Sequence, residues 1–273
     1  MIVLLEKLAT ELKIRGFSVK TVNAYISNNK SFLEFIGKDA KDVNEDYVKA
    51  YMAHLMDKGL KPASVSLAMS AIRFLHDEMM DKSIFAKIKL PKPEKKLPTV
   101  LSKEEIRKML DSTTNAKHKL LISFLYSSGL RVSEAVSMKI DDLDLNERMG
   151  IVRAGKGKKD RNIILSESLV NDLRKYLGTR KDENPYVFDI KDRHIVVRQA
   201  QRVVSEAAKK AGIKKRVFCH ALRSSFATHL LEAGTDIRVI QELLGHANLA
   251  TTQLYTKVSR EQLKKVKSPM DDL

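Results

Sequence analysis

The chain has 273 residues, of which 43% are hydrophobic, so it is long enough for one domain with a sizeable core or for two smaller ones. Its 50 lysines and arginines outnumber its 34 acidic residues, and the net charge of +16 favours a polyanionic partner such as nucleic acid over the alternative of an ordinary lysine-rich surface. The single cysteine, Cys219, excludes an internal disulfide and predicts a reducing cytoplasm, and the lack of a long apolar run excludes a membrane-spanning segment.

Residues 1–86 predict four helices with apolar side chains at helical spacing. Ser18 and Asn44 are expected to cap the second and third helices, because a short polar side chain can accept hydrogen bonds from the first free backbone N–H groups. Pro62 is expected in the first turn of the fourth helix, where its missing N–H costs nothing. The pattern predicts a small, all-helical first domain.

Residues 87–101 break this pattern and predict an extended linker, since three prolines exclude a helix. One interpretation is a merely soluble linker. We favour a strap across a nucleic-acid backbone, because the charge of the segment has the same sign as that of the whole chain. Its candidate DNA-binding residues are Lys87, Lys89, Lys92, Lys95 and Lys96.

A second domain is predicted over residues 102–273, and it begins with a capping-box pattern at Ser102 and Glu105. Further along, a glycine turn leads to Arg131 at the start of a new helix, where free backbone N–H groups suit an anion. Glu134, three residues on, can orient the guanidinium. The alternative is that Arg131 and Glu134 form an ion pair for stability alone.

Residues 149–165 change to a β pattern, because two β-branched runs flank a glycine- and lysine-rich turn and so indicate a hairpin with a basic tip. Lys156 lies between two glycines and could serve as a general acid toward a leaving oxygen, since its ammonium group is carried on a flexible stem. A solvated turn is the alternative, and the spacing is not that of a P-loop. The other basic residues assigned here to DNA binding are Lys158, Lys159 and Arg161.

The stretch from His220 to Tyr255 holds the most reactive set of side chains. His220 and Arg223 are three residues apart on a predicted helix, so they can reach the same ligand. His246 directly follows a glycine that ends a second helix, and Tyr255 lies on a third.

These groups suit the cleavage of a phosphodiester without a metal ion. Arg223 can bind two phosphate oxygens through its forked guanidinium, and the histidines can donate hydrogen bonds or transfer protons near neutral pH. Tyr255 can act as a covalent nucleophile if nearby donors and positive charges activate its hydroxyl. No cofactor is expected.

Five short motifs together resemble the tyrosine recombinase (phage-integrase-like) family in order and spacing, over about residues 103–258. They are SSGLRVSE at 127–134, GKGKKDR at 155–161, HALR at 220–223, LLGH at 243–246 and TTQLYTK at 251–257. The small helical first domain is similar to that of the Xer subgroup, archaeal or bacterial. One departure is Ser224, because many relatives have histidine directly after the motif arginine.

The resemblance implies a role for each matching side chain. Arg131 and Arg223 would bind the scissile phosphate, and His246 would donate to one of its oxygens. His220 would assist proton transfer, and Lys156 would protonate the leaving 5′ oxygen. Tyr255 would attack the phosphorus and stay joined to the DNA 3′ phosphate, so that neither ATP nor metal is needed for rejoining.

The resemblance also implies a mainly α fold with a small β-hairpin or sheet in the second domain, arranged as a two-domain clamp on double-stranded DNA. By the same resemblance, four protomers would act on two DNA sites and would resolve chromosome dimers at a dif-like sequence. The tail after Tyr255 would dock on a neighbouring protomer or pack on its own domain. Two other functions stay open: a type IB topoisomerase, and a DNA-binding protein without catalysis.

Overall fold

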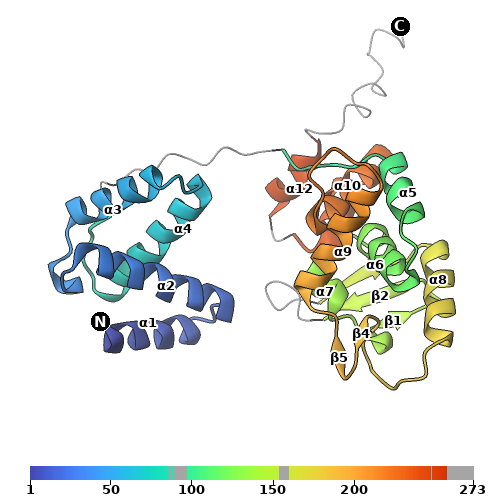
Figure 1. Ribbon diagram of the computed structural model, residues 1–273, viewed down its shortest axis with the longest axis horizontal. Coiled ribbons are helices and arrows are strands. Elements are labelled where there is room, and N and C mark those ends of the chain that lie inside the picture. Colours follow the sequence, from blue (N-terminus) through green and yellow to red (C-terminus); the bar gives the residue numbers. More distant parts are fainter. Residues whose placement is uncertain (86–87, 89–96, 154–159, 247, 257–273) are drawn as a thin grey trace, which may run out of the picture. The chain divides into compact units, whose positions relative to one another are not determined.

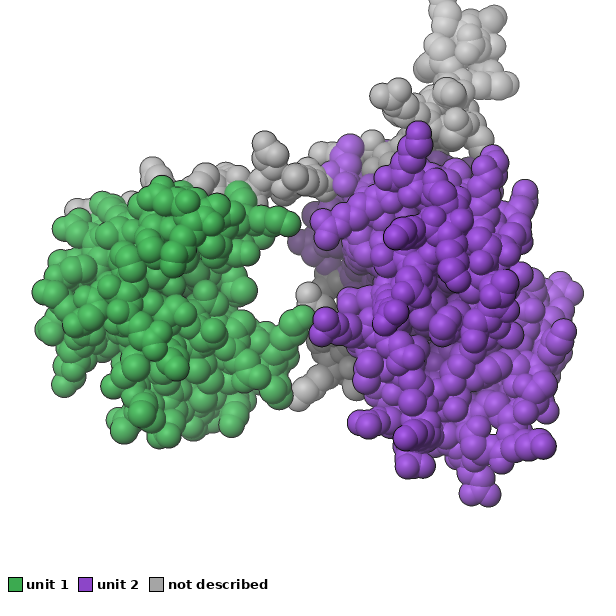
Figure 2. All heavy atoms as spheres, in the orientation of Figure 1, with its two compact units in different colours: residues 1–95 green, residues 96–273 purple. Residues whose placement is uncertain are grey.

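The computed structural model describes residues 1–85, 88, 97–153, 160–246 and 248–256. The chain divides into two compact units, residues 1–95 and 96–273 (Figure 2). Within the described part of the chain, no helix is both long and apolar enough to cross a bilayer.

The first unit is entirely helical in its described residues. Two of its predicted caps are confirmed: the Ser18 side chain accepts a hydrogen bond from the backbone N of Thr21, and Asn44 accepts from Asp46 and Tyr47. Pro62 occupies the first turn of its helix, as predicted. The elements are α1 (Ile2–Ile14), α2 (Val19–Ile36), a 3-10 turn (Ala40–Asp42), α3 (Glu45–Asp57) and α4 (Pro62–Arg73).

The end of α4 differs from the prediction of a regular helix. The backbone changes to a π-helical segment at Phe74–Met79, which buries His76 completely. The Nδ1 atom of His76 lies 3.0 Å from the carbonyl oxygen of Ile72. An extra residue in a helical turn shifts the following side chains around the axis, which the spacing of apolar residues did not indicate.

In its described residues, the second unit combines helices with two small pairings of strands (Figure 1). Its helices are α5 (Lys103–Asp111), α6 (Ala116–Ser127), α7 (Val132–Val136), α8 (Glu167–Gly178), α9 (Val197–Lys210), α10 (Cys219–Glu232), α11 (Ile237–Leu244) and α12 (Leu249–Thr256). A 3-10 turn covers Ile140–Asp142. The strands are β1 (Leu143–Asp144), β2 (Met149–Val152), β3 (Arg161–Ile164), β4 (Asp189–Ile190) and β5 (Arg193–His194).

The predicted hairpin is confirmed as β2 and β3, which pair antiparallel with Gly150 opposite Ile163. The short strand β1 adds to β2 and makes a three-stranded antiparallel sheet, and β4 and β5 form a separate pair. The predicted fold class, mainly α with a small sheet in the second unit, is therefore confirmed.

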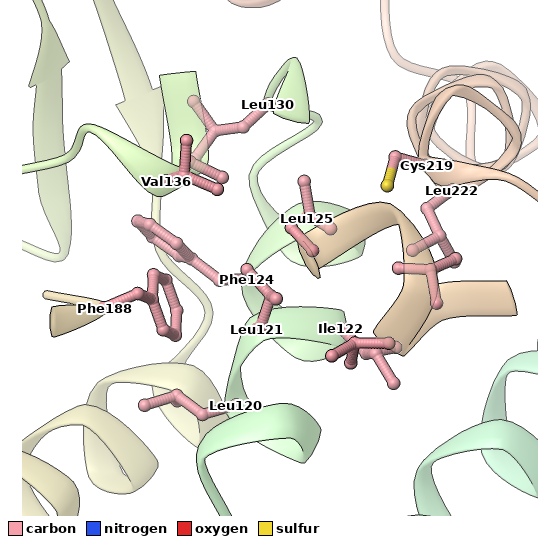
Figure 3. Close-up of a cluster of buried hydrophobic side chains, with 14 of the residues drawn as sticks. Leu120, Leu121, Ile122, Phe124, Leu125, Leu130, Val136, Phe188, Cys219 and Leu222 are labelled. Carbon is pink, nitrogen blue, oxygen red and sulfur yellow. The ribbon is translucent and has the colours of Figure 1, made fainter. Parts of the chain in front are cut away.

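Helix α6 lies at the centre of the second core, where its leucines and phenylalanine are almost fully buried. Figure 3 shows Phe124 beside Phe188, and their ring centroids are 5.8 Å apart. Cys219 and Leu222 bring α10 into the same core, and burial raises the pKa of the Cys219 thiol to about 11. This packing holds α10, the helix that carries His220 and Arg223, in a fixed position.

Candidate active site

Arg223 is the largest of the fully buried side chains in the described residues, with 1% of its surface exposed. Its Nη1 donates to the carbonyl oxygen of Gly129 at 2.6 Å, and its Nη2 donates to that of Leu244 at 2.5 Å. The Nε atom is buried and has no hydrogen-bond partner in the described part of the chain. Arg223 thus joins the glycine turn to the end of α11 and keeps one N–H donor for a ligand.

Arg131 lies at the start of α7 and is held by Glu134, as predicted. The Glu134 carboxylate accepts from Arg131 Nη1 at 2.7 Å and from the Arg131 backbone N at 2.8 Å. Arg131 Nη2 also lies 3.3 Å from the carbonyl oxygen of Gly245. These contacts turn the guanidinium toward the end of α11, next to Arg223.

Arg161 corrects the sequence prediction, which placed it on the exposed basic tip of the hairpin. It lies in β3, and its side chain is only 7% exposed. Its Nη1 and Nη2 donate to the two carboxylate oxygens of Glu134 at 2.9 and 2.6 Å, and its Nε donates to the carbonyl oxygen of Leu243 at 2.9 Å. The side chain of Arg161 points from β3 into the protein. Its guanidinium therefore binds Glu134 and is not exposed to solvent or DNA.

His246 and Tyr255 are brought together by the turn from α11 into α12. The imidazole and phenol rings are nearly parallel, with centroids 6.3 Å apart and an interplanar angle of 22°. The Nδ1 atom of His246 lies 3.0 Å from the hydroxyl oxygen of Thr252, one turn of α12 before Tyr255. Tyr255 is 4% exposed. Burial raises the pKa of Tyr255, and the nearby charge of Arg223 acts in the opposite direction.

His220 is the most accessible of these groups, at the start of α10. Partial desolvation of its ring lowers its pKa, and the charges of Arg223 and Arg131 lower it further. The structure therefore gathers five predicted residues in one unit: Arg131, His220, Arg223, His246 and Tyr255. His229 follows His220 by nine residues in α10, which puts it on the opposite face of the helix, and its Nδ1 atom contacts the hydroxyl of Tyr126.

Lys156, Lys158 and Lys159, together with the five linker lysines, lie outside the described residues. The residues that sequence analysis missed here are Gly129, whose carbonyl holds Arg223, and Thr252, which contacts His246. Thr252 precedes Tyr255 by one helical turn, and this spacing is the signal that could have identified it.

Gly129 provides a test of how tightly this site is packed. Its φ of +59° is a backbone conformation that side chains disfavour, and an added Cβ would lie 2.3 Å from Cδ1 of Phe226. We expect Gly129→Ala to lower the free energy of unfolding of the second unit by about 2–3 kcal/mol. Thermal denaturation measures this. Gly178→Ala is the control, because nothing lies within 4 Å of its added Cβ, and an equal loss there would contradict the explanation.

The lowered pKa of His246 predicts that the stability of this unit depends on pH. Burial, with the charges of Arg223 and Arg131, lowers the pKa of His246 to about 4. A histidine with a lowered pKa in the folded state takes up protons more readily when unfolded, so its contribution is complete above its ordinary pKa and is lost as the pH falls toward 4. We expect wild-type protein to lose about 1 kcal/mol more than His246→Gln between about pH 7.5 and 5.5. Denaturant titration at both pH values measures the difference, and parallel losses would contradict it.

Comparisons with known proteins match both units. The model for the phage integrase family matches residues 99–262, and the model for the phage integrase N-terminal SAM-like domain matches residues 4–85. The chain belongs to the phage integrase family, and it is a tyrosine site-specific recombinase.

Among named relatives, it is similar to the tyrosine recombinase XerA of Pyrococcus horikoshii, with 40% identity over 96% of this chain and 91% of that protein. It is also similar to a crystal structure of XerA recombinase, with 30% identity, a TM-score of 0.57 and 96% of each chain covered. A structure of XerH site-specific recombinase bound to palindromic difH substrate, a post-cleavage complex, gives a TM-score of 0.74 at 26% identity over 98% of this chain and 84% of that one.

Proposed function

We propose that this protein cleaves and rejoins double-stranded DNA through a 3′-phosphotyrosyl bond at Tyr255, and that it resolves chromosome dimers at a dif-like site. One observation carries the proposal: a buried tyrosine lies beside a histidine and within electrostatic reach of two arginines, whose contacts go mainly to backbone carbonyls and one shared carboxylate. The similarity to XerA and to XerH with its difH substrate supports the choice of target.

The chemistry is a transfer of the phosphoryl group. The Tyr255 hydroxyl loses its proton with help from His220 and attacks the phosphorus, while Arg131 and Arg223 stabilise the charge that develops on the phosphate oxygens. His246 donates a hydrogen bond to one of those oxygens. The bond from phosphorus to the 5′ oxygen breaks, and Lys156 gives that oxygen a proton. The reverse steps join a new 5′ hydroxyl.

The burial of Tyr255 adds a requirement. Because only 4% of the residue as a whole is exposed, we infer that α12 or its neighbours move to give a phosphate access to the hydroxyl. We infer that DNA binding drives this movement, since a phosphate between Arg131 and Arg223 makes new charge-assisted hydrogen bonds that can offset its cost.

The remaining parts of the chain have proposed roles in DNA binding and assembly. Residues 1–86 would form a core-DNA-binding domain, residues 87–101 a basic linker, and residues 102–273 the catalytic domain, so that the two domains clamp the duplex. The lysines of the linker and of the hairpin tip would contact phosphates. Four protomers would act together at two sites, and the tail after Tyr255 would dock on a neighbouring protomer.

The test is to trap the covalent intermediate. A dif-like duplex with a nick a few nucleotides to the 3′ side of the cleavage position loses its short fragment after attack, so the adduct accumulates. We expect protein on the 3′ phosphate, together with products that join two sites. Relaxation of any supercoiled plasmid without joining would favour a type IB topoisomerase. DNA binding with no adduct would favour a protein without catalysis.

A further inference from the structure

We propose that Arg161 is a positioning residue that neutralises Glu134, so that Arg131 and Arg223 keep their positive charge for the reacting phosphate. This inference rests on the proposed cleavage chemistry. Arg161 itself would not touch the DNA; it would act through the carboxylate that it shares with Arg131.

Each of the three guanidinium nitrogens of Arg161 donates a hydrogen bond inside the protein. Both terminal nitrogens donate to Glu134, one to each carboxylate oxygen, and Nε donates to the carbonyl oxygen of Leu243. Leu243 lies just before Leu244 and Gly245, whose carbonyl oxygens accept from Arg223 and Arg131. One end of α11 is thus bonded to all three guanidiniums. Strand β3 holds Arg161 against it from the hairpin.

Glu134 is the point where the three charges meet. Every ion pair that Arg131, Arg161 and Arg223 make within the described residues goes to this carboxylate, at 2.7, 2.6 and 3.9 Å respectively. Hydrogen bonds from Arg161 and Arg131 hold the pKa of Glu134 at about 2, despite the opposing effect of burial, so the group is ionised. A buried carboxylate with no dedicated partner would draw both phosphate-binding arginines toward itself.

The count of charges explains why Arg161 matters to the reaction. Three guanidiniums and one carboxylate leave two positive charges in excess. A phosphodiester carries about one negative charge, and attack by a phenolate brings that to about two in the five-coordinate transition state. Without Arg161, the excess falls to a single charge, and the transition state loses more stabilisation than the ground state does. The cleavage rate should therefore fall more than the affinity for DNA.

Arg153 offers a matched control. Arg153 directly follows β2, the other strand of the hairpin. Like Arg161 it forms an ion pair, with Asp142 at 2.6 Å, but its side chain is 63% exposed. Arg153→Gln removes the same charge from the same hairpin, so it reports the effect of net charge on DNA binding. Arg161→Lys keeps the positive charge but cannot make all of the bonds of the guanidinium.

The experiment measures three quantities for each variant on the nicked duplex: the single-turnover rate of adduct formation, the Kd for DNA and the melting temperature. We expect Arg161→Gln to form the adduct at least tenfold more slowly than Arg153→Gln at a similar Kd. Arg161→Lys should retain a larger share of the rate. The double variant Glu134→Gln with Arg161→Gln restores the excess of two charges, so it should cleave faster than Arg161→Gln alone.

Three results would overturn the proposal: an unchanged rate in Arg161→Gln, equal slowing in Arg153→Gln, or a double variant as slow as the single one. If Arg161→Gln melts below the assay temperature, the comparison of the double variant with Arg161→Lys still decides between charge and packing. Wild-type protein that forms no adduct would instead contradict the proposed function itself, so the two failures are distinguishable.

Discussion

Replacing Tyr255 with phenylalanine abolishes the covalent adduct with DNA while leaving DNA binding intact. The phenol is the only group that this substitution alters, and no other residue of the proposed mechanism forms a bond to phosphorus. Removing a nucleophile lowers the rate of such reactions by at least about 10³-fold. The phenyl ring fills the same space against its apolar neighbours Phe226, Leu231 and Leu244, so the fold is kept. Denaturing gels of the nicked duplex show the adduct, and fluorescence anisotropy gives the Kd.

Tyr126→Phe is the matched control for this result. Its hydroxyl is also partly buried in the second unit, where it contacts Nδ1 of His229 at 2.9 Å, but it lies outside the proposed site. This variant is expected to form the adduct at the wild-type rate. Undiminished adduct in Tyr255→Phe would refute the nucleophile assignment, and equal loss in both variants would point to a general effect of removing a buried hydroxyl.

Replacing Arg223 with lysine has the second-largest expected effect, although the charge is conserved. A single ammonium group cannot hold the carbonyl oxygens of Gly129 and Leu244 and also donate to a phosphate, as the three guanidinium nitrogens can. We expect the rate of adduct formation to fall by about 10²–10³-fold, the usual effect of losing a donor to a transition-state oxygen. The melting temperature should also fall, because one buried carbonyl oxygen loses its donor.

Arg180→Lys separates these two effects. Arg180 is another arginine of the second unit with little exposure, and it donates to the carbonyl oxygens of Tyr186 and Asn184. Its replacement should lower the melting temperature to a similar degree without slowing adduct formation at a temperature where both variants are folded. If Arg180→Lys slows the reaction as much as Arg223→Lys does, then loss of stability, and not of phosphate contacts, explains both.

Much of the local structure follows from short-range rules that operate within a few residues. Ser18, Asn44 and Asp236 begin their helices because each side chain accepts a hydrogen bond from a nearby backbone N–H group. Gly37 and Gly245 end helices because they adopt the left-handed conformation. A prediction based on spacing succeeds in such places because the partners are neighbours in the chain.

The sequence by itself determined the types of reactive side chain, their order, and the helices and hairpin that carry them. Only the tertiary structure decided where Arg161 points and that Glu134 is shared by arginines from three elements. It also decided that Tyr255 is buried beside His246. The reason is physical: a strand sends alternate side chains to opposite faces, so an arginine in a basic run can face solvent or the interior. For Arg161, the inward direction depends on its contact with the carboxylate of Glu134, which lies 27 residues away in the chain.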